Sequence, residues 1–403
     1  MPTVAITDGW VLVYVFERLL SPKFITLAMS RGRVSTPSLP PELWIRIHRL
    51  VLSNLSPLVK IYASDDTIIN IRSGVKSDNH AANVRDLQLF LKAALSLRCV
   101  CRLWSELGLE FLFENIWIND SGWPSLSSSL QHPNVARLVR SIRLSTTRFD
   151  HNIDVLARCP HLEVLVQPEF PRTERLYSGT TVQLPPLQSL KRLYWVVSAW
   201  SSVLLQSVLF AAPNLEHISL SGTPTIVFDP ATQPTFPDLP RLNSLALITL
   251  DTGCVLAILR ADLSRLTHLT INPAYLASDL FPVLPALQML TLLEHSSRLP
   301  FPGIFARCPA LRELRYNALR PFSRPEERQR APFLACIRLF LQLRMSPTQA
   351  QAQVALLLGP AFSALERVML DGPGWGTPPS PEAMWPGTAD LLARGCRIEK
   401  GVE

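Results

Sequence analysis

The sequence predicts an α/β solenoid, with short parallel strands on a concave face and helices or turns on a convex face, preceded by a small all-helical domain. Two observations lead to this prediction. A short phrase with apolar residues at its first, fourth and sixth positions recurs from about residue 139 to residue 370, and two helical segments with apolar stripes precede it. A unit too small to cover its own apolar side must stack on its neighbours, which gives one elongated core.

The repeated phrase occurs in ten copies, most of them spaced within the roughly 20 to 29 residues typical of leucine-rich repeats. In LEHISL, for example, Leu215 is followed by Ile218 and Leu220. The last two apolar residues alternate with polar ones, as a half-buried strand requires. We therefore predict a leucine-rich-repeat solenoid with one strand in each copy. The copies begin at Val139, Leu162, Leu190, Leu215, Leu242, Leu266, Leu287, Leu311, Leu334 and Leu365.

The convex side is predicted to be helical from the residues that come before the phrase. In three copies an apolar helical turn ends at a small residue and is followed by Pro160, Pro213 or Pro309. Because proline cannot continue a helix, each pattern indicates a helix end followed by a strand start. Cys159 and Cys308 hold equivalent places in two of these copies, which predicts small buried side chains and not redox groups.

Two segments before the repeats predict helices. Residues 38–52 read SLPPELWIRIHRLVL, with two prolines just inside a helix start and one apolar face. The second helical segment covers residues 89–118, where NIWIN at its end has the character of a strand. The polar, poorly periodic residues 53–88 between them predict a surface loop or a partly disordered insertion. The predicted domains are an extension at 1–36, a helical domain at 37–118 with the inserted loop 53–88, and the solenoid at 119–403.

The two helical segments resemble an F-box, through LPPEL in the first and VCRLW in the second. With the repeats behind them, the chain is similar to F-box/leucine-rich-repeat proteins of the divergent type frequent in mushroom-forming fungi. The resemblance implies that the F-box docks on the Skp-family adaptor of a cullin-based ubiquitin ligase, while the repeats capture a protein substrate. The adaptor-binding residues that it implies are Leu39, Pro40, Pro41, Leu43, Ile47, Leu97, Val100, Cys101 and Trp104.

Alternatives remain open for this segment. The same apolar residues could fill a helical core, because an apolar stripe does not reveal whether its partner is internal or another chain. The inserted loop 53–88 is harmless if its ends stay close, since the entropy of loop closure grows slowly with length. Otherwise it obstructs docking of the adaptor.

The concave face of the solenoid should carry the residues between the repeated leucines, since side chains alternate along a strand. Arginines outnumber acids there, which suggests a partner of acidic or mixed charge, because guanidinium groups pair well with carboxylates and phosphates. The simpler interpretation is a solvated sheet face. The predicted partner-binding residues are Arg143, Arg192, Tyr194, His217, His268, Glu313, Arg315, Arg338 and Arg367.

The sequence contains no motif typical of a catalytic, cofactor or metal site. It has no phosphate-cradling glycine loop, no G-x-S-x-G and no H-E-x-x-H, and its seven cysteines lack zinc-ligand spacing. We therefore expect a non-catalytic protein without a cofactor. The odd number of scattered cysteines favours a reducing compartment, either cytoplasm or nucleus.

Composition and charge limit the partners. The apolar run at residues 10–16 is far shorter than the roughly 20 residues needed to cross a bilayer, so no membrane partner is expected. A net charge of +7 is modest for 403 residues, and no zinc finger or aromatic-plus-basic sheet motif favours nucleic acid.

Two functions from different classes follow. The first is the substrate-recognition subunit of a Skp–cullin ubiquitin ligase, which binds an unknown protein and performs no chemistry. The second is a protein-interaction scaffold without a ligase role, whose F-box-like helices only cap the first repeat. A basic nucleic-acid binder is a third and weaker alternative.

Overall fold

The computed structural model describes the chain in separate stretches that all lie after residue 112. The chain divides into two compact units, residues 1–115 and 116–403, and the described stretches belong almost entirely to the second. The predicted extension 1–36 and most of the F-box-like segment, with its loop 53–88, lie outside the described residues. The described stretches are 113–118, 123–144, 148–167, 182–197, 202–222, 236–250, 252–272, 281–293, 304–317, 331–340, 347–371 and 388–400.

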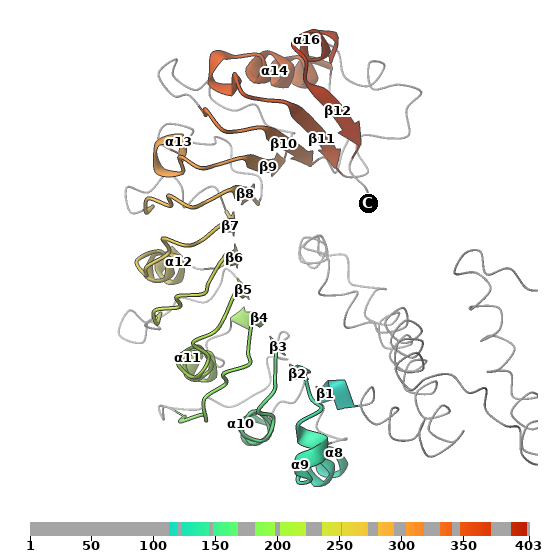
Figure 1. Ribbon diagram of the computed structural model, residues 1–403, viewed down its shortest axis with the longest axis vertical. Helices are drawn as coiled ribbons and strands as arrows, with labels where there is room; N and C mark the ends of the chain where they lie inside the picture. Colours follow the sequence, from blue (N-terminus) through green and yellow to red (C-terminus); the bar gives the residue numbers. More distant parts are fainter. Residues whose placement is uncertain are drawn as a thin grey trace, which may run out of the picture. The chain divides into compact units, whose positions relative to one another are not determined.

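One sheet of twelve strands runs through the described residues, and its strand order follows the sequence from β1 to β12 (Figure 1). Every neighbouring pair from β2 to β12 is parallel. The predicted α/β fold with parallel strands is thus confirmed. The strands are β1 Asn115–Ile118, β2 Ser141–Leu144, β3 Val164–Gln167, β4 Arg192–Val197, β5 His217–Gly222, β6 Ser244–Ile248, β7 His268–Ile271, β8 Met289–Leu292, β9 Glu313–Asn317, β10 Cys336–Phe340, β11 Arg367–Asp371 and β12 Arg397–Lys400.

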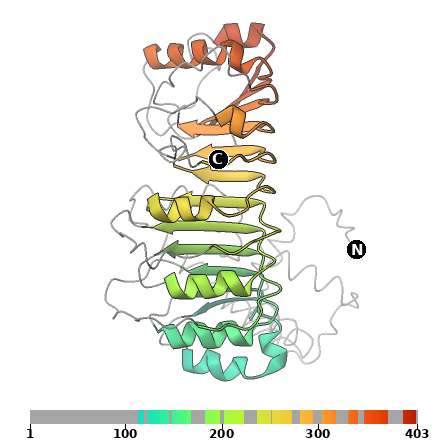
Figure 2. The same ribbon diagram turned by 90° about the vertical axis from the view of Figure 1, so that its left-hand side faces the viewer.

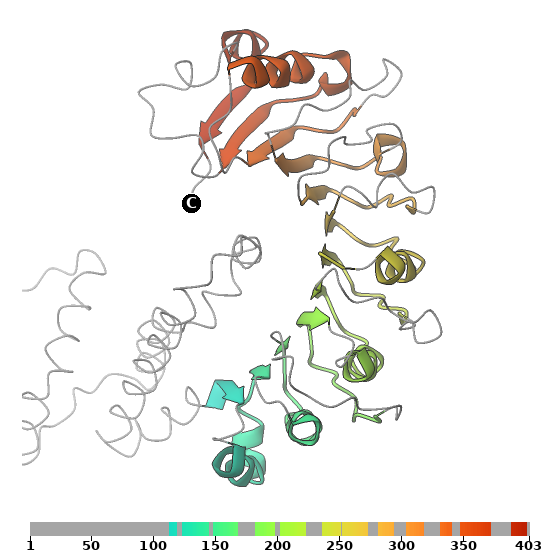
Figure 3. The same cartoon turned by 180° about the vertical axis from the view of Figure 1, so that it is seen from behind.

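The helices of this unit cover one face of the sheet. Figure 2 shows the strands as successive rungs with the helices in front of them, and Figure 3 shows the helices on the outer side of the curved row of strands. The other face of the sheet lies on the inner, concave side. The helices are α8 Trp123–Leu130, α9 Pro133–Ala136, α10 Phe149–Arg158, α11 Ser202–Ala211, α12 Thr252–Leu259, α13 Ile304–Arg307, α14 Pro347–Leu357, the 3₁₀ helix η3 Pro360–Phe362, and α16 Thr388–Ala393.

The repeated leucines form the core, as the phrase predicts. All ten predicted start residues are buried, and each lies two positions before its strand. Side chains at the fourth position of neighbouring copies are in register, so Ile218 pairs with Leu245, Leu245 with Leu269, and Leu269 with Leu290. None of these four side chains is more than 1% exposed. Each repeat therefore covers the apolar residues of the next, and the core is continuous along the sheet.

A chain of backbone hydrogen bonds fixes the register where the strands begin. The carbonyl of Glu163 accepts the N–H groups of both Lys191 and Arg192, at 2.9 and 3.0 Å. The carbonyl of Lys191 does the same for Glu216 and His217, at 2.8 and 3.0 Å. The pattern continues through the array to β11. A slip of one residue would break these bonds and would turn the leucines to the exposed face, so the register is strongly specified.

Helical and extended connections alternate on the convex side. Helices α10, α11, α12, α13 and α14 precede β3, β5, β7, β9 and β11. The three predicted helix ends are confirmed, because α10, α11 and α13 end one or two residues before Pro160, Pro213 and Pro309. The described residues directly before β4, β6, β8 and β10 form no helix, and they are rich in proline. These extended connections are 182–191, 236–243, 281–288 and 331–335.

Both ends of the array extend beyond the ten predicted copies. The predicted strand at NIWIN is β1, so the sheet begins at Asn115, a few residues before the predicted start of the solenoid at 119. At the other end, α16 and β12 form the predicted partial repeat. The guanidinium group of Arg394 donates to the carbonyls of Phe362 at 2.7 Å and Leu357 at 3.1 Å, which ties this last unit to α14 and η3.

The shared core predicts a large stability difference between two substitutions in the same repeat. Leu290→Ala removes a side chain that is fully buried, and we expect it to lower the free energy of unfolding by about 2–5 kcal/mol. Val283→Ala changes a side chain that is 63% exposed and should cost less than about 0.5 kcal/mol. Denaturant unfolding of the full chain measures both values. Equal effects of the two substitutions would contradict the observed burial.

The buried cysteines predict slow thiol chemistry in the folded protein. Burial raises the pKa of Cys159 and of Cys308 to about 12, so at pH 8 only about one thiol in ten thousand is ionised. We expect neither residue to react with iodoacetamide until the protein is unfolded in urea, as read by mass spectrometry of the peptides. Labelling of either cysteine at the same rate with and without urea would show that these two positions are open to solvent.

Candidate functional site

The concave side of the sheet is its exposed face. Along β9, the partly exposed side chains of Glu313, Arg315 and Asn317 alternate with the buried side chains of Leu314 and Tyr316. The same alternation holds along β11. Side chains at the first, third and fifth positions of the strands therefore share the concave face, and those at the second and fourth positions face the helices. Some side chains of the concave face are nevertheless buried, among them Ser141, Val166, Ser219, Ala246, Ile248, Thr291 and Cys336.

The structure places all nine predicted partner-binding residues on the exposed face, but in two separate groups. Arg192 and His217 are directly opposite each other on β4 and β5, and Arg315 and Arg338 are opposite each other on β9 and β10. The first group, on β2 to β7, is Arg143, Arg192, Tyr194, His217 and His268. The second group, on β9 to β11, is Glu313, Arg315, Arg338 and Arg367. The nine adaptor-binding residues predicted from the F-box resemblance lie outside the described residues.

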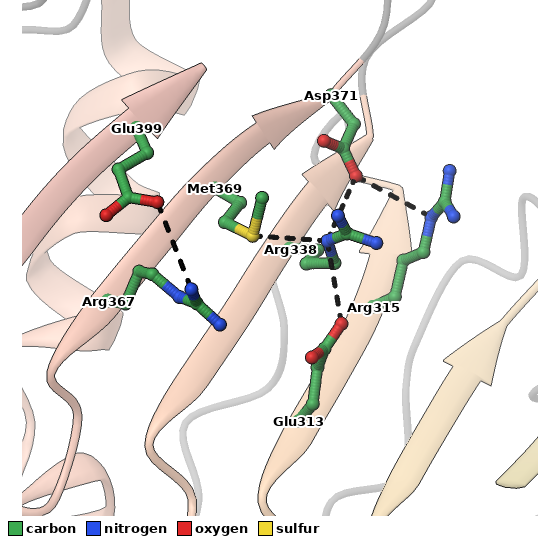
Figure 4. A network of polar contacts seen from close by, with 7 residues as sticks. All are labelled: Glu313, Arg315, Arg338, Arg367, Met369, Asp371 and Glu399. Carbon is green, nitrogen blue, oxygen red and sulfur yellow. Dashed lines mark hydrogen bonds and ion pairs between the residues drawn. The ribbon is translucent and has the colours of Figure 1, made fainter. Parts of the chain in front are cut away.

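The second group belongs to a network of ion pairs over β9 to β12 (Figure 4). The Nε atom of Arg338 lies 3.5 Å from Oε1 of Glu313 and 3.6 Å from Oδ2 of Asp371. The same Nε donates to the thioether sulfur of Met369 at 3.3 Å. We call this set the C-terminal ion-pair network. Its charged members are Glu313, Arg315, Arg338, Arg367, Asp371 and Glu399.

Asp371 is the centre of the network, since it forms ion pairs with two arginines on different strands. Its Oδ2 atom lies 3.9 Å from Nε of Arg315 as well as close to Arg338. The side chains of Arg315 and Asp371 are only 11% and 12% exposed, so water screens this pair weakly. Arg315 also stacks over the ring of Phe340, with 5.7 Å between its Cζ atom and the ring centroid. These contacts hold strands β9, β10 and β11 together on their exposed side.

The outer pair of the network is weaker. Nη1 of Arg367 lies 4.0 Å from Oε2 of Glu399, and both side chains are more than 40% exposed. A solvent-exposed pair of this kind contributes at most about 1 kcal/mol. In the network as a whole, three carboxylates balance three guanidinium groups. The surplus of arginine expected from the sequence therefore disappears in this part of the face, because Asp371 and Glu399 were not among the predicted residues.

The first group has a different chemistry. The guanidinium group of Arg143 lies over the ring of Trp117, with 4.8 Å between its Cζ atom and the ring centroid. The rings of Tyr194 and His217 are 5.1 Å apart, and Nδ1 of His217 is 2.8 Å from Oγ of Ser244. We call this set the basic–aromatic surface. Its members are Trp117, Arg143, Arg192, Tyr194, His217 and His268.

Sequence reasoning missed three residues of the two clusters, and the signal for each was available. Trp117 is the third residue of NIWIN, for which the sequence predicted only a strand. Asp371 stands at the fifth position of β11, whereas the predicted residues all stand at first or third positions of their strands. Glu399 lies in the last partial repeat, which was taken only as a cap. Extending the alternation by one position and by one strand at each end would have found all three.

The described residues were also compared with the requirements of a metal site and of a membrane span. Within these stretches, no group of three or more histidine, cysteine or acidic side chains could hold a metal ion. Among the described helices, none has both the length and the apolar character needed to cross a membrane. Comparison with protein-family models and with curated proteins found no match for this chain.

The central position of Asp371 predicts that its loss destabilises the last strands. Asp371→Asn keeps the shape of the side chain but leaves Arg315 and Arg338 without their shared carboxylate, so we expect a loss of about 1–3 kcal/mol in the free energy of unfolding. The matched change Glu399→Gln breaks the exposed pair and should cost less than about 1 kcal/mol. Hydrogen exchange of the β9–β12 amides, together with denaturant unfolding, measures both. Slower exchange in Asp371→Asn than in the unchanged protein would contradict this role.

Proposed function

We propose that this protein is a non-catalytic substrate-recognition subunit of a cullin-based ubiquitin ligase. An F-box at residues 37–118 binds the Skp-family adaptor, and a leucine-rich-repeat solenoid behind it captures a protein substrate. The observation that supports the capture role best is the exposed face of the sheet. It presents polar, charged and aromatic side chains along a sheet of twelve consecutive strands, on a scaffold whose core is mostly apolar.

The leucine-rich-repeat assignment rests on the agreement between the phrase and the strands. Each of the ten copies begins with a buried apolar residue two positions before a strand, and each contributes one strand to the sheet. Repeat arrays of this kind use one extended face to bind partners. The described residues contain no competing feature such as a metal cluster. Protein capture is the function that this geometry supports best.

The ligase assignment rests on LPPEL and VCRLW, the segments that resemble an F-box. In this role the protein performs no reaction of its own. It raises the local concentration of a bound substrate beside the conjugating enzyme, and the rate increase comes from proximity and orientation. If the adaptor does not bind, the same exposed face supports the alternative of a protein-interaction scaffold without a ligase role.

Binding of the adaptor is the direct test. We expect the intact protein to retain a purified Skp-family adaptor in a pull-down, because the F-box supplies an apolar docking helix. The double substitution Leu39→Ala and Pro40→Ala should reduce the retained adaptor by about tenfold or more, equivalent to about 1.4 kcal/mol.

The matched control is a double substitution in the inserted segment, Ser77→Ala and Asp78→Ala, which should leave adaptor binding unchanged. Absence of adaptor binding by the intact protein would reject the ligase role and leave the scaffold. Loss of binding in the control variant would instead show that the inserted segment takes part in docking.

A further inference from the structure

The exposed face of the sheet carries its acidic side chains at one end only. In the described residues of β1 to β8, no first, third or fifth position holds aspartate or glutamate. The acidic residues of the face, Glu313, Asp371 and Glu399, all belong to β9–β12 and are paired there with arginine. The positive groups of β1 to β8 therefore face an area without neighbouring carboxylates on the same face.

Arg192 is the clearest positive group of this area. It is exposed at the first position of β4, and it forms no ion pair with another described residue. The carboxylates nearest in sequence register, Glu163 and Glu216, each precede a neighbouring strand, and Glu163 is already 3.4 Å from Arg140. A partner carboxylate could thus approach Arg192 without first displacing an ion pair of the described chain.

Three positively charged or chargeable side chains lie in one row. Arg192, His217 and His268 occupy the first positions of β4, β5 and β7, with Ser244 of β6 between the two histidines. Neighbouring strands are about 4.8 Å apart, so the row is about 14 Å long. An extended segment of four or five residues, at about 3.3 Å per residue, covers this length.

The side chains beside this row are small. The third positions of β5, β6 and β7 hold Ser219, Ala246 and Thr270, and the first two of these are buried. The exposed first positions, Arg192 and His268, are therefore the side chains that a partner can reach. Tyr194 and Trp117 stand at the third positions of β4 and β1. Aromatic side chains and arginine are the residues that most often dominate binding energy at protein interfaces.

A partner carboxylate would bind the C-terminal ion-pair network less favourably than the basic–aromatic surface. A partner carboxylate that approached Arg338 would have to displace Glu313 or Asp371, and it would leave one of them without its arginine. Removing one member of a partly buried pair is costly, so exchange at this end is unfavourable. The two ends of the face therefore have different roles.

We propose that the basic–aromatic surface binds an acidic segment of a partner protein, and that the C-terminal ion-pair network stabilises the end of the solenoid without taking part in recognition. This inference rests on the protein-capture part of the proposed function and does not require the ligase part. Arg192 supplies the unpaired charge, His268 and His217 continue the row, and the ring of Tyr194 lies beside His217. Trp117 lies three strands away from Arg192, on β1, where it stacks with Arg143.

A synthetic peptide tests the proposal with the full chain. The probe is a fluorescein-labelled peptide of alternating glutamate and tyrosine, and its reference is the same peptide with glutamine in place of glutamate. Fluorescence anisotropy at low salt gives the two dissociation constants. We expect the glutamate peptide to bind about tenfold or more tightly than the glutamine peptide, and to lose this advantage at high salt.

Two charge reversals locate the site. Arg192→Glu should weaken binding of the glutamate peptide by about tenfold or more, whereas Arg367→Glu should change it by less than about twofold. The two variants have the same net charge, and both changes are at exposed first positions, so the comparison separates location from overall charge. If Arg192→Glu does not fold, as judged by its thermal melt, His268→Glu serves as the second test at the other end of the row.

Equal weakening by Arg192→Glu and Arg367→Glu would overturn the proposal, as would equal binding of the two peptides. The adaptor pull-down on the same proteins separates this inference from the ligase role. A chain that binds the glutamate peptide at Arg192 but not the adaptor keeps this inference and rejects the ligase. A chain that binds the adaptor but does not distinguish the peptides rejects this inference alone.

Discussion

The structure depends on one constraint, which is that no repeat can bury its own leucines. Ile218 on β5 is covered because Leu245 lies opposite it on β6, and Leu245 is covered in turn by Leu269 on β7. The paired N–H groups that reach each preceding carbonyl hold these side chains in register. Since alternate side chains point to opposite faces, the same register that buries the leucines sets which residues face outward. The exposed face is therefore a direct consequence of the core, and its residues keep fixed positions relative to one another.

The exposed face has the same arrangement of parallel strands along its length, but the charges of its side chains differ between the two ends. Over β9 to β12, Arg338 and Asp371 form an ion pair between the neighbouring strands β10 and β11, and Arg315 and Asp371 form one between β9 and β11. Over β1 to β8, Arg192 meets no such partner among the described residues. The same residue type thus has two different environments on one face. Arg338 lies beside an aspartate of its own chain, whereas Arg192 lies on an area without acidic side chains, which is the area proposed above for partner binding.

The start of each repeat could be predicted from the sequence because the leucines that must be buried are visible in it. Leu215 and Leu287 each lie two positions before a strand, since the phrase records which side chains must be buried. The alternation of helical and extended connections could not be predicted in the same way. Both kinds of connection place a buried residue three positions before the leucine, such as Ala212 before Leu215 and Leu284 before Leu287. The local pattern is the same, and only the prolines further upstream distinguish them. The pairing of Arg315 with Asp371 could not be predicted from the sequence either. It joins β9 and β11, which are two strands apart, and it depends on side-chain conformations that the sequence does not specify.

The alternation of connections has a geometric origin and a consequence for how such a chain grows. A helix with its side chains is about 10 Å across, which is about twice the distance between neighbouring strands, so every second strand can carry a helix without spreading the sheet. From β3 to β11 the unit that recurs is accordingly a pair of repeats, one with a helical connection and one with an extended connection. The first residues of strands that are two apart in the sheet are separated by 45 to 54 residues of sequence. A gene duplication that adds one repeat would set two helices, or two proline-rich segments, next to each other. A duplication that adds two repeats preserves the alternation of helical and extended connections, so the geometry of this array favours growth by pairs of repeats.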